Sequence, residues 1–196
     1  MASSGPSELP TRGRNRSETD PPPENLVDGR VRLVESDPKW PYFFEREARR
    51  IRDALGDRVL LLEHVGSTSV PGLVAKPCVD LLLCVADPAD ESAYVPGLEA
   101  AGYLVAIREP EWYEHRVLKG TEINLNLHVF AHGCEEVERM LRLRDHLRAD
   151  AGARARYTAL KKALAERDWN HIQDYADAKS EVVEELLAEA AGQPTA

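Results

Sequence analysis

The chain has 196 residues, and its hydrophobic content of 43% is enough apolar material for the core of one globular domain. Its formal net charge of -9, from 25 basic and 34 acidic residues, excludes a generally basic surface of the kind that binds nucleic acid or anionic membranes. No apolar run approaches the roughly 20 residues of a membrane span, and the 3 cysteines (Cys78, Cys84 and Cys134) lack C-x-x-C spacing, so we expect a cytoplasmic protein without disulfides or a membrane partner.

The N-terminal segment, residues 1–28, is rich in proline, serine, glycine and charged residues and has almost no apolar side chains. Such a composition cannot compensate for the entropy lost on ordering, and it lacks the apolar core of a secretory signal. We therefore expect a disordered tail over 1–28, with a regulatory or targeting arm as the alternative. The folded domain is expected over 29–192.

The remaining sequence predicts an α+β domain, in which strands come first and helices follow. The helix expected after residue 37 has Asp37 as its cap and Pro38 in its first position, and Gly56 ends it. In chain order, the expected elements are a strand at 30–34, a helix to 55, strands at 59–65 and 79–85, a helix at 91–101, strands at 103–107, 113–118 and 123–130, and helices at 135–149, 153–167 and 170–190. One mixed sheet should therefore carry a helical layer drawn largely from the C-terminal third.

The last two expected strands form a hairpin, for which Lys119-Gly120-Thr121 is the turn signal. The second of them alternates in polarity along its length. One face carries Ile123, Leu125, Leu127 and Val129, and the other carries Asn124, Asn126, His128 and Phe130.

The stretch HVGSTSVPGLVAKPCVD, residues 64–80, joins two apolar strands through small and hydroxyl-bearing residues. Gly66 permits a tight turn and a close approach of the backbone to a ligand. The amides and hydroxyls of Ser67, Thr68 and Ser69 form a concave site of the kind that binds phosphate. An ordinary structural turn between two strands is the alternative.

The stretch ends on Asp80, which stands at the beginning of an apolar strand, where its carboxylate is placed to hold a divalent metal. Two structural roles are the alternatives: Asp80 caps the strand, or it pairs with Lys76. His64 and His128 also have two possible roles each, functional or structural. Each lies in a predicted strand, where a hydrogen-bonded core histidine is as common as a functional one. A zinc site is a further alternative, and its ligands would be His128, His132 and Cys134 with Cys84.

These residues also carry a family resemblance. HVGSTSVPGLVAKP-x-x-D resembles the signature of the GrpB family, a branch of the nucleotidyltransferase superfamily with the polymerase-β-like fold. The resemblance covers about residues 30–190, and it includes VRLVESDPKW at 31–40, Asn126 to Phe130, Leu143 to Arg148, Tyr157-x-x-Leu160-Lys161 and Tyr175-x-x-x-Lys179.

The resemblance implies a Gly-Ser motif at a helix N-terminus that binds the phosphates of ATP or another nucleoside triphosphate, and Mg²⁺ held by acidic residues on the next strand. In active members of the superfamily that strand usually reads Asp-x-Asp or Asp-x-Glu, whereas Asp80-Leu81-Leu82 offers one carboxylate. Glu63 is the candidate for a second metal ligand, and the polar row that includes Asn126 and His128 is the alternative. Many relatives have His-x-His where this chain has Asn126-x-His128.

The resemblance also selects basic residues for contacts with the phosphates or with an acidic substrate: Lys76, Arg144, Lys161 and Lys179. Asp145 and Tyr175 are expected to orient them. For each base on a helix, the alternative is an ordinary solvated face.

We therefore expect a nucleotidyltransferase-like protein that binds a nucleoside triphosphate with Mg²⁺ and transfers a nucleotidyl group to a small-molecule acceptor. Asp80 would hold the metal, and His128 would serve as a base or ligand. One alternative is a catalytically degenerate nucleotide-binding module, which Leu82 favours. Another is an accessory role in coenzyme A metabolism, since relatives occur fused behind dephospho-CoA kinase, although this chain lacks the G-x-x-x-x-G-K-[ST] motif of that kinase. The acceptor, the nucleotide base and the oligomeric state remain open.

Overall fold

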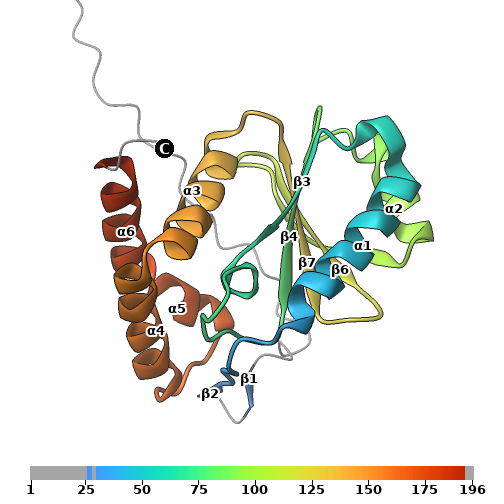
Figure 1. The fold of residues 1–196 in the computed structure, drawn as a ribbon. Coiled ribbons are helices and arrows are strands. Elements are labelled where there is room, and N and C mark those ends of the chain that lie inside the picture. The colour runs from blue at the N-terminus through green and yellow to red at the C-terminus, as the bar shows by residue number, and fades with distance from the viewer. Residues whose placement is uncertain (1–25, 28–29, 193–196) are drawn as a thin grey trace, which may run out of the picture.

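The protein is described by a computed structural model that covers residues 26–27 and 30–192 (Figure 1). Most of the expected tail over 1–28 lies outside the described residues. Leu26–Val27 form strand β1, which pairs in antiparallel fashion with β2 (Arg30–Val31). The strand expected at 30–34 is therefore shorter, and Val34 instead forms an isolated bridge with Ala75.

The central sheet is mixed and five-stranded, which confirms the predicted α+β class. Its strands are β3 (Leu61–Val65), β4 (Val79–Val85), β5 (Tyr103–Glu109), β6 (His115–Gly120) and β7 (Leu125–Ala131), in the spatial order β3-β4-β7-β6-β5. The pair β4 and β7 is parallel, and the other pairs are antiparallel. Lys119 and Gly120 belong to β6, so the hairpin turn predicted at 119–121 is wrong and the connection runs through 121–124 instead.

Helices cover both faces of the sheet. They are α1 (Lys39–Leu55), α2 (Val95–Ala100), α3 (Glu135–Ala149), α4 (Ala151–Ala165), α5 (Ile172–Asp177) and α6 (Ser180–Gly192). Figure 1 shows α1 and α2 on one side of the sheet and the C-terminal helices on the other. The helix expected at 170–190 is interrupted after Asp177, where the Lys179 amide donates to the Ala176 carbonyl and tightens the last turn of α5.

Local signals explain both ends of α1. The side chain of Asp37 accepts a hydrogen bond from the Lys39 amide at 2.8 Å and so satisfies one donor of the first turn. The helix begins at Lys39 with Pro38 as its N-cap, so the prediction of Asp37 as cap and Pro38 as first residue is wrong by one position. Gly56 ends the helix with a φ of 56°, a value that glycine adopts without strain.

Strand β4 is covered on both faces, and this positions its first residue. Leu81 and Leu83 pack in the core cluster that includes Ile51 of α1, whereas Leu82 and Cys84 pack with Val137 of α3. A strand buried on both sides reads as a continuous apolar run, as VDLLLCV does.

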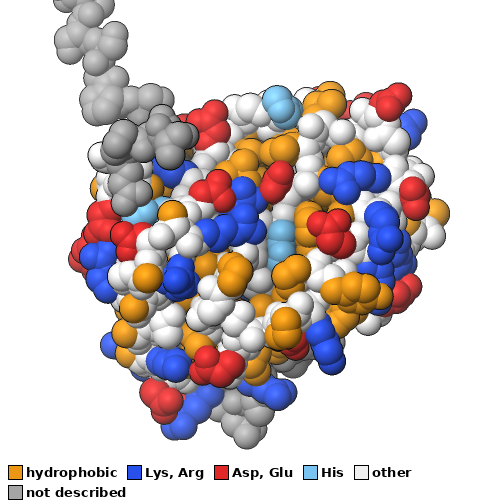
Figure 2. All heavy atoms as spheres, in the orientation of Figure 1, with side chains coloured by type: hydrophobic (Ala, Val, Ile, Leu, Met, Phe, Trp, Pro, Cys, Tyr) orange, Lys and Arg blue, Asp and Glu red, His pale blue; other side chains and the backbone are white. Residues whose placement is uncertain are grey.

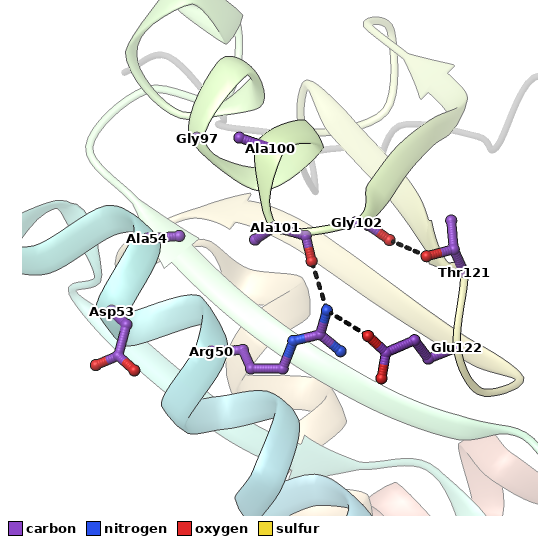
Figure 3. Close-up of a pocket in the computed structure, with 9 residues that line it drawn as sticks. All are labelled: Arg50, Asp53, Ala54, Gly97, Ala100, Ala101, Gly102, Thr121 and Glu122. Atoms are coloured by element: carbon purple, nitrogen blue, oxygen red, sulfur yellow. Dashed lines mark hydrogen bonds and ion pairs between the residues drawn. The ribbon is translucent and has the colours of Figure 1, made fainter.

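A shallow depression of about 640 Å³ lies between α1, α2 and the loop after β6 (Figure 3). Arg50 donates to the Ala101 carbonyl at 2.8 Å and pairs with Glu122 at 2.9 Å, and the Thr121 hydroxyl donates to the Gly102 carbonyl at 2.9 Å. These groups bind one another and hold the loop against α2, so we assign the depression a structural role.

Candidate functional site

The connection between β3 and β4 begins with a tight turn. Gly66 has a φ of 67°, and Ser67–Ser69 form a single 3-10 turn rather than the start of an α-helix that the family resemblance implied. Its first hydrogen bond runs from the Ser69 amide to the Gly66 carbonyl, so the turn does not use the amides of Ser67 and Thr68. The hydroxyl of Ser69 donates to the same carbonyl at 2.6 Å, and Thr68 Oγ1 lies 3.0 Å from His64 Nε2. Thr68 and Ser69 therefore stabilise the turn from within, while Ser67 is partly exposed.

Asp80, the first acidic residue after this turn, lies directly against Gly66. A Cβ atom on Gly66 would be 2.5 Å from Asp80 Oδ2. The other oxygen, Oδ1, accepts a hydrogen bond from Asn126 Nδ2 at 2.7 Å and lies 3.6 Å from His128 Nε2. Burial raises the pKa of the Asp80 carboxyl, but His128, Asn126 and Lys76 together outweigh it and hold that pKa below its usual range. Asp80 is therefore an anion with a partly exposed side chain.

A chain of titratable side chains extends from Asp80 across the sheet. His128 Nδ1 lies 3.1 Å from His115 Nε2, and His115 Nδ1 lies 2.7 Å from Glu109 Oε2. The rings of His115 and His128 stack with their planes 8° apart. The register places them together, because His128 lies beside Leu82 of β4 on one side and Val117 of β6 on the other. The structure thus unites the two residues predicted as catalytic, Asp80 and His128.

Three lysines lie close enough to Asp80 to interact with its charge: Lys76, Lys161 and Lys179. Lys161 is 2% exposed and donates to the Val74 carbonyl, while Lys76 and Lys179 lie over the ring of Tyr175 at 5.9 and 4.4 Å from its centroid. Burial lowers the pKa of Lys179 to about 7, and the charge of Lys76 acts in the same direction. Burial, followed by the charges of Lys179 and Lys76, holds the pKa of Lys161 well below its usual range.

Tyr175 has its hydroxyl in the interior. The side chain is fully buried, and its oxygen makes no hydrogen bond within the part of the chain that the structure describes. The expected association of Tyr175 with these bases is therefore present as two cation-π contacts.

Arg144, the fourth base expected at the phosphates, is engaged elsewhere. Its Nη1 donates to Glu63 Oε2 at 2.7 Å and to the His64 carbonyl at 3.1 Å, and its Nε donates to Asp145 Oδ1 at 2.7 Å. Asp145 thus orients Arg144, as expected. Glu63, the expected second metal ligand, is paired opposite Leu82 in the sheet, and its carboxylate binds Arg144.

The side chains around Asp80 offer few ligands for Mg²⁺. Leu82 is fully buried, and within 26–27 and 30–192 no three His, Cys, Asp or Glu side chains are grouped so as to hold a metal, which also leaves the zinc alternative without a described site. Mg²⁺ usually keeps several waters and binds through one or two carboxylates together with substrate phosphates. Asp80 alone fits a single ion that arrives with a nucleotide, whereas a two-metal site does not fit.

Sequence reasoning missed Glu109 and His115, and it treated Asn126 as a candidate metal ligand rather than as a donor to Asp80. The signal that could have found them is the pairing of the two hairpin strands, which brings His115 beside the polar face of β7. Because the turn was predicted at 119–121, the predicted pairing of the two strands was wrong and did not bring His115 next to His128.

Comparison with known proteins places the chain among homologues. The family model described as "GrpB protein" matches residues 30–189. UPF0157 protein BH1888 of Halalkalibacterium halodurans is 55% identical over 160 residues, which are 82% of this chain and 82% of that protein. A dephospho-CoA kinase of Mycolicibacterium paratuberculosis is 31% identical over 175 residues, which cover 76% of this chain but 43% of the kinase.

Comparison with solved structures agrees with the family match. The crystal structure of the conserved protein GrpB from Enterococcus faecalis superposes with a TM-score of 0.72 at 31% identity, covering 81% of this chain and 96% of that one. A variant of the Cid1 poly(U) polymerase bound to MgATP superposes with a TM-score of 0.50 at 17% identity, covering 68% of this chain and 45% of the polymerase. The fold is therefore nucleotidyltransferase-like. None of the helices in the described residues has the length and apolarity needed to cross a bilayer.

Proposed function

The chain belongs to the GrpB family, and from that premise we propose that it binds a nucleoside triphosphate with Mg²⁺ beside Asp80 and transfers the nucleotidyl group to a small-molecule acceptor. The observation that carries the proposal is the group of Lys76, Lys161 and Lys179 next to one carboxylate. No ion pair within the described residues joins any of these three ammonium groups to a carboxylate. Asp80 attracts Lys161 and Lys179, and Asp177 also attracts Lys179, but burial and the repulsion among the lysines outweigh these attractions. Desolvated cations that outnumber the carboxylates near them are costly unless a ligand supplies more negative charge.

A triphosphate has the charge that this site lacks. Ammonium groups bind phosphate oxygens through short, charge-assisted hydrogen bonds, and the amides of Ser67 and Thr68, which the 3-10 turn does not use, would add neutral donors. Asp80 would hold Mg²⁺, which neutralises phosphate charge when it is bound with the nucleotide. ATP is the nucleotide bound to the polymerase variant that shares this fold, and it is the first nucleotide to test here.

The reaction would be an in-line displacement at the α-phosphorus. A hydroxyl oxygen of the acceptor forms a bond to that phosphorus, the bond to the bridging oxygen breaks, and pyrophosphate leaves. The acceptor proton passes to His128, whose ring is held between Asp80 and His115. Positioning and charge neutralisation then supply most of the rate enhancement.

A binding module without transfer activity is the second candidate, and Leu82 is the observation that favours it. This side chain is fully buried where active members of the superfamily usually carry a carboxylate. The likeness to one segment of a longer dephospho-CoA kinase gives such a module a context, as an accessory to coenzyme A metabolism.

Calorimetric titration with MgATP tests the binding step. We expect saturable binding that Asp80→Asn weakens only when Mg²⁺ is present and that Lys161→Met weakens with or without the metal. Lys162→Met is the matched control, because Lys162 follows Lys161 on α4 but is exposed. Equal affinities in all four proteins, or no binding, would contradict the proposal. Pyrophosphate release from MgATP with a panel of hydroxyl and amine acceptors then separates the enzyme from the binding module.

A further inference from the structure

A second hollow, of about 510 Å³, lies at the outer edge of the sheet, where β3 is the last strand. We call it the β3 pocket. Its walls come from the first turns of α1, from β3 and the turn that follows it, and from α3 and α4: Pro41, Phe44, Glu45, Glu63, His64, Ser69, Pro71, Arg148 and Arg154. A cavity of this size is typical of sites for small molecules.

One wall of the β3 pocket is apolar and uncharged. The ring of His64 stacks on Phe44, with centroids 5.0 Å apart and planes 9° apart, and its Nε2 is held by Thr68. Burial lowers the pKa of His64 to about 4, since the opposing effect of Asp80 is smaller, so the imidazole is neutral near pH 7. Pro41 and Pro71 extend this wall. Such a surface suits the uncharged body of a ligand.

The β3 pocket is also lined by two cations that are anchored by backbone carbonyls. Arg148 Nε donates to the Ser69 carbonyl at 3.0 Å, and Arg154 Nη1 donates to the carbonyls of Leu147 and Arg148 at 2.8 and 3.2 Å. These bonds fix both guanidinium groups in place without neutralising them.

Arg144 binds the two carboxylates that would otherwise neutralise Arg148 and Arg154. Glu63 and Asp145 both bind Arg144 at 2.7 Å, and Asp145 forms a second, longer ion pair with Arg148 at 3.7 Å. Three guanidinium groups therefore share two carboxylates. Arg154 forms no ion pair in the part of the chain that the structure describes. Burial and the charge of Arg144 lower the pKa of Arg148, and they outweigh the attraction of Asp145 and Glu63, which raises it. The remaining acid of the lining, Glu45, is exposed. The pocket therefore holds an excess of positive charge at one end.

The β3 pocket shares a wall with the proposed nucleotide site. Gly66 begins the turn that borders both sites and lies against Asp80, while Ser69 ends that turn and lines the pocket. A ligand in the pocket and a nucleotide at Asp80 would thus both contact one short turn.

We propose that the β3 pocket binds the acceptor, and that the acceptor is a small molecule with a carboxylate or phosphate group at Arg148 and Arg154 and an apolar part against Phe44. The role as acceptor site rests on the proposed function. The recognition of an organic anion does not, because it follows from the lining of the pocket alone.

Phenyl phosphate and benzoate are suitable probes, with benzyl alcohol as the uncharged control, and binding is followed by amide chemical shifts in the full chain. We expect both anions to shift the amides of Phe44, His64 and Ser69, with and without saturating MgATP, and benzyl alcohol to bind at least tenfold more weakly. Arg148→Gln and Arg154→Gln should each weaken the binding of the anions by roughly tenfold, because each removes a charged hydrogen bond. Arg148→Lys should retain part of the affinity, and Lys161→Met should leave it unchanged.

The outcomes separate the two proposals. If MgATP fails to bind while the anions still require Arg148 and Arg154, the proposed function fails and the anion pocket stands. If neither anion binds saturably, if benzyl alcohol binds as tightly, or if both arginine variants bind as the wild type does, the inference is overturned. If Lys161→Met is the only variant that weakens the binding of the anions, they occupy the nucleotide site and the inference is again overturned.

Discussion

Gly66 and Asp80 are in such close contact that any side chain at position 66 would meet the carboxylate: a Cβ atom there would lie 2.5 Å from Oδ2. The sequence suggested that Gly66 permits a close approach of the backbone to a ligand. The group that approaches it in the structure is the side chain of Asp80, so the glycine helps to define where the carboxylate lies.

This contact predicts the effect of Gly66→Ala. The substitution displaces the carboxylate and strains a backbone at a φ of 67° and a ψ of -174°, a conformation essentially restricted to glycine. Gly72→Ala, at a φ of 77° with nothing near its Cβ, adds backbone strain without such a contact. We expect Gly72→Ala to cost about 1 kcal/mol of unfolding free energy and Gly66→Ala clearly more. Urea denaturation measures both. Equal losses would show that the contact with Asp80 carries no weight.

The buried lysine predicts a gain in stability at the expense of binding. Lys161→Met keeps most of the side-chain volume and removes a charge that is desolvated and repelled by Lys76 and Lys179. We expect the ligand-free variant to be as stable as the wild type or more stable, despite losing the bond to the Val74 carbonyl. Lys162→Met should change the unfolding free energy by no more than about 0.5 kcal/mol. A large loss of stability in Lys161→Met alone would show that the lysine serves the fold.

Lys179 predicts a pH dependence of the ligand-free protein. Its pKa is about 7 in the folded state and 10.5 ordinarily, so between these values the unfolded chain binds the extra proton. Stability therefore rises with pH across this window and is lowest below pH 7. We expect the slope of unfolding free energy between about pH 7 and pH 10 to be smaller in Lys179→Met. An identical slope in both proteins would exclude Lys179 as its source.

Leu82→Asp would restore the acidic pattern of the strand, but we expect it to destabilise the fold rather than to create a metal site. The side chain is fully buried against Val65, Phe130 and Val137, so an aspartate there would be an unpaired charge in the core. We expect Leu82→Asp to lower the free energy of unfolding, measured by urea denaturation, by about 3 kcal/mol or more. Leu82→Met should lower it by less than about 1.5 kcal/mol. A stable Leu82→Asp variant with increased Mg²⁺ affinity would show that the site tolerates a second carboxylate.

Strand β4 and helix α3 were predictable to the residue, because an apolar run and a helical period are local properties of the chain. Gly66, Asp80 and His128 could be selected for the same reason, with support from the family signature. The hairpin turn at 119–121 and the continuous helix at 170–190 were wrong. Their positions depend on strand register and on the packing of α5 and α6, which no short window contains.

By itself, the sequence determined the α+β class, the position of the glycine turn and the single carboxylate of β4, since each follows from neighbouring residues. Only the tertiary structure decided that Arg144 holds Glu63 and that His115 and Glu109 extend the chain from Asp80. It also decided that the lysines from the loop before β4, from α4 and from the turn between α5 and α6 come together near Asp80 without forming an ion pair among the described residues. The physical reason is that these partners are far apart along the chain and meet only through the sheet register and the packing of helices. Whether a charge is neutralised depends on its neighbours in space, which sequence distance does not reveal.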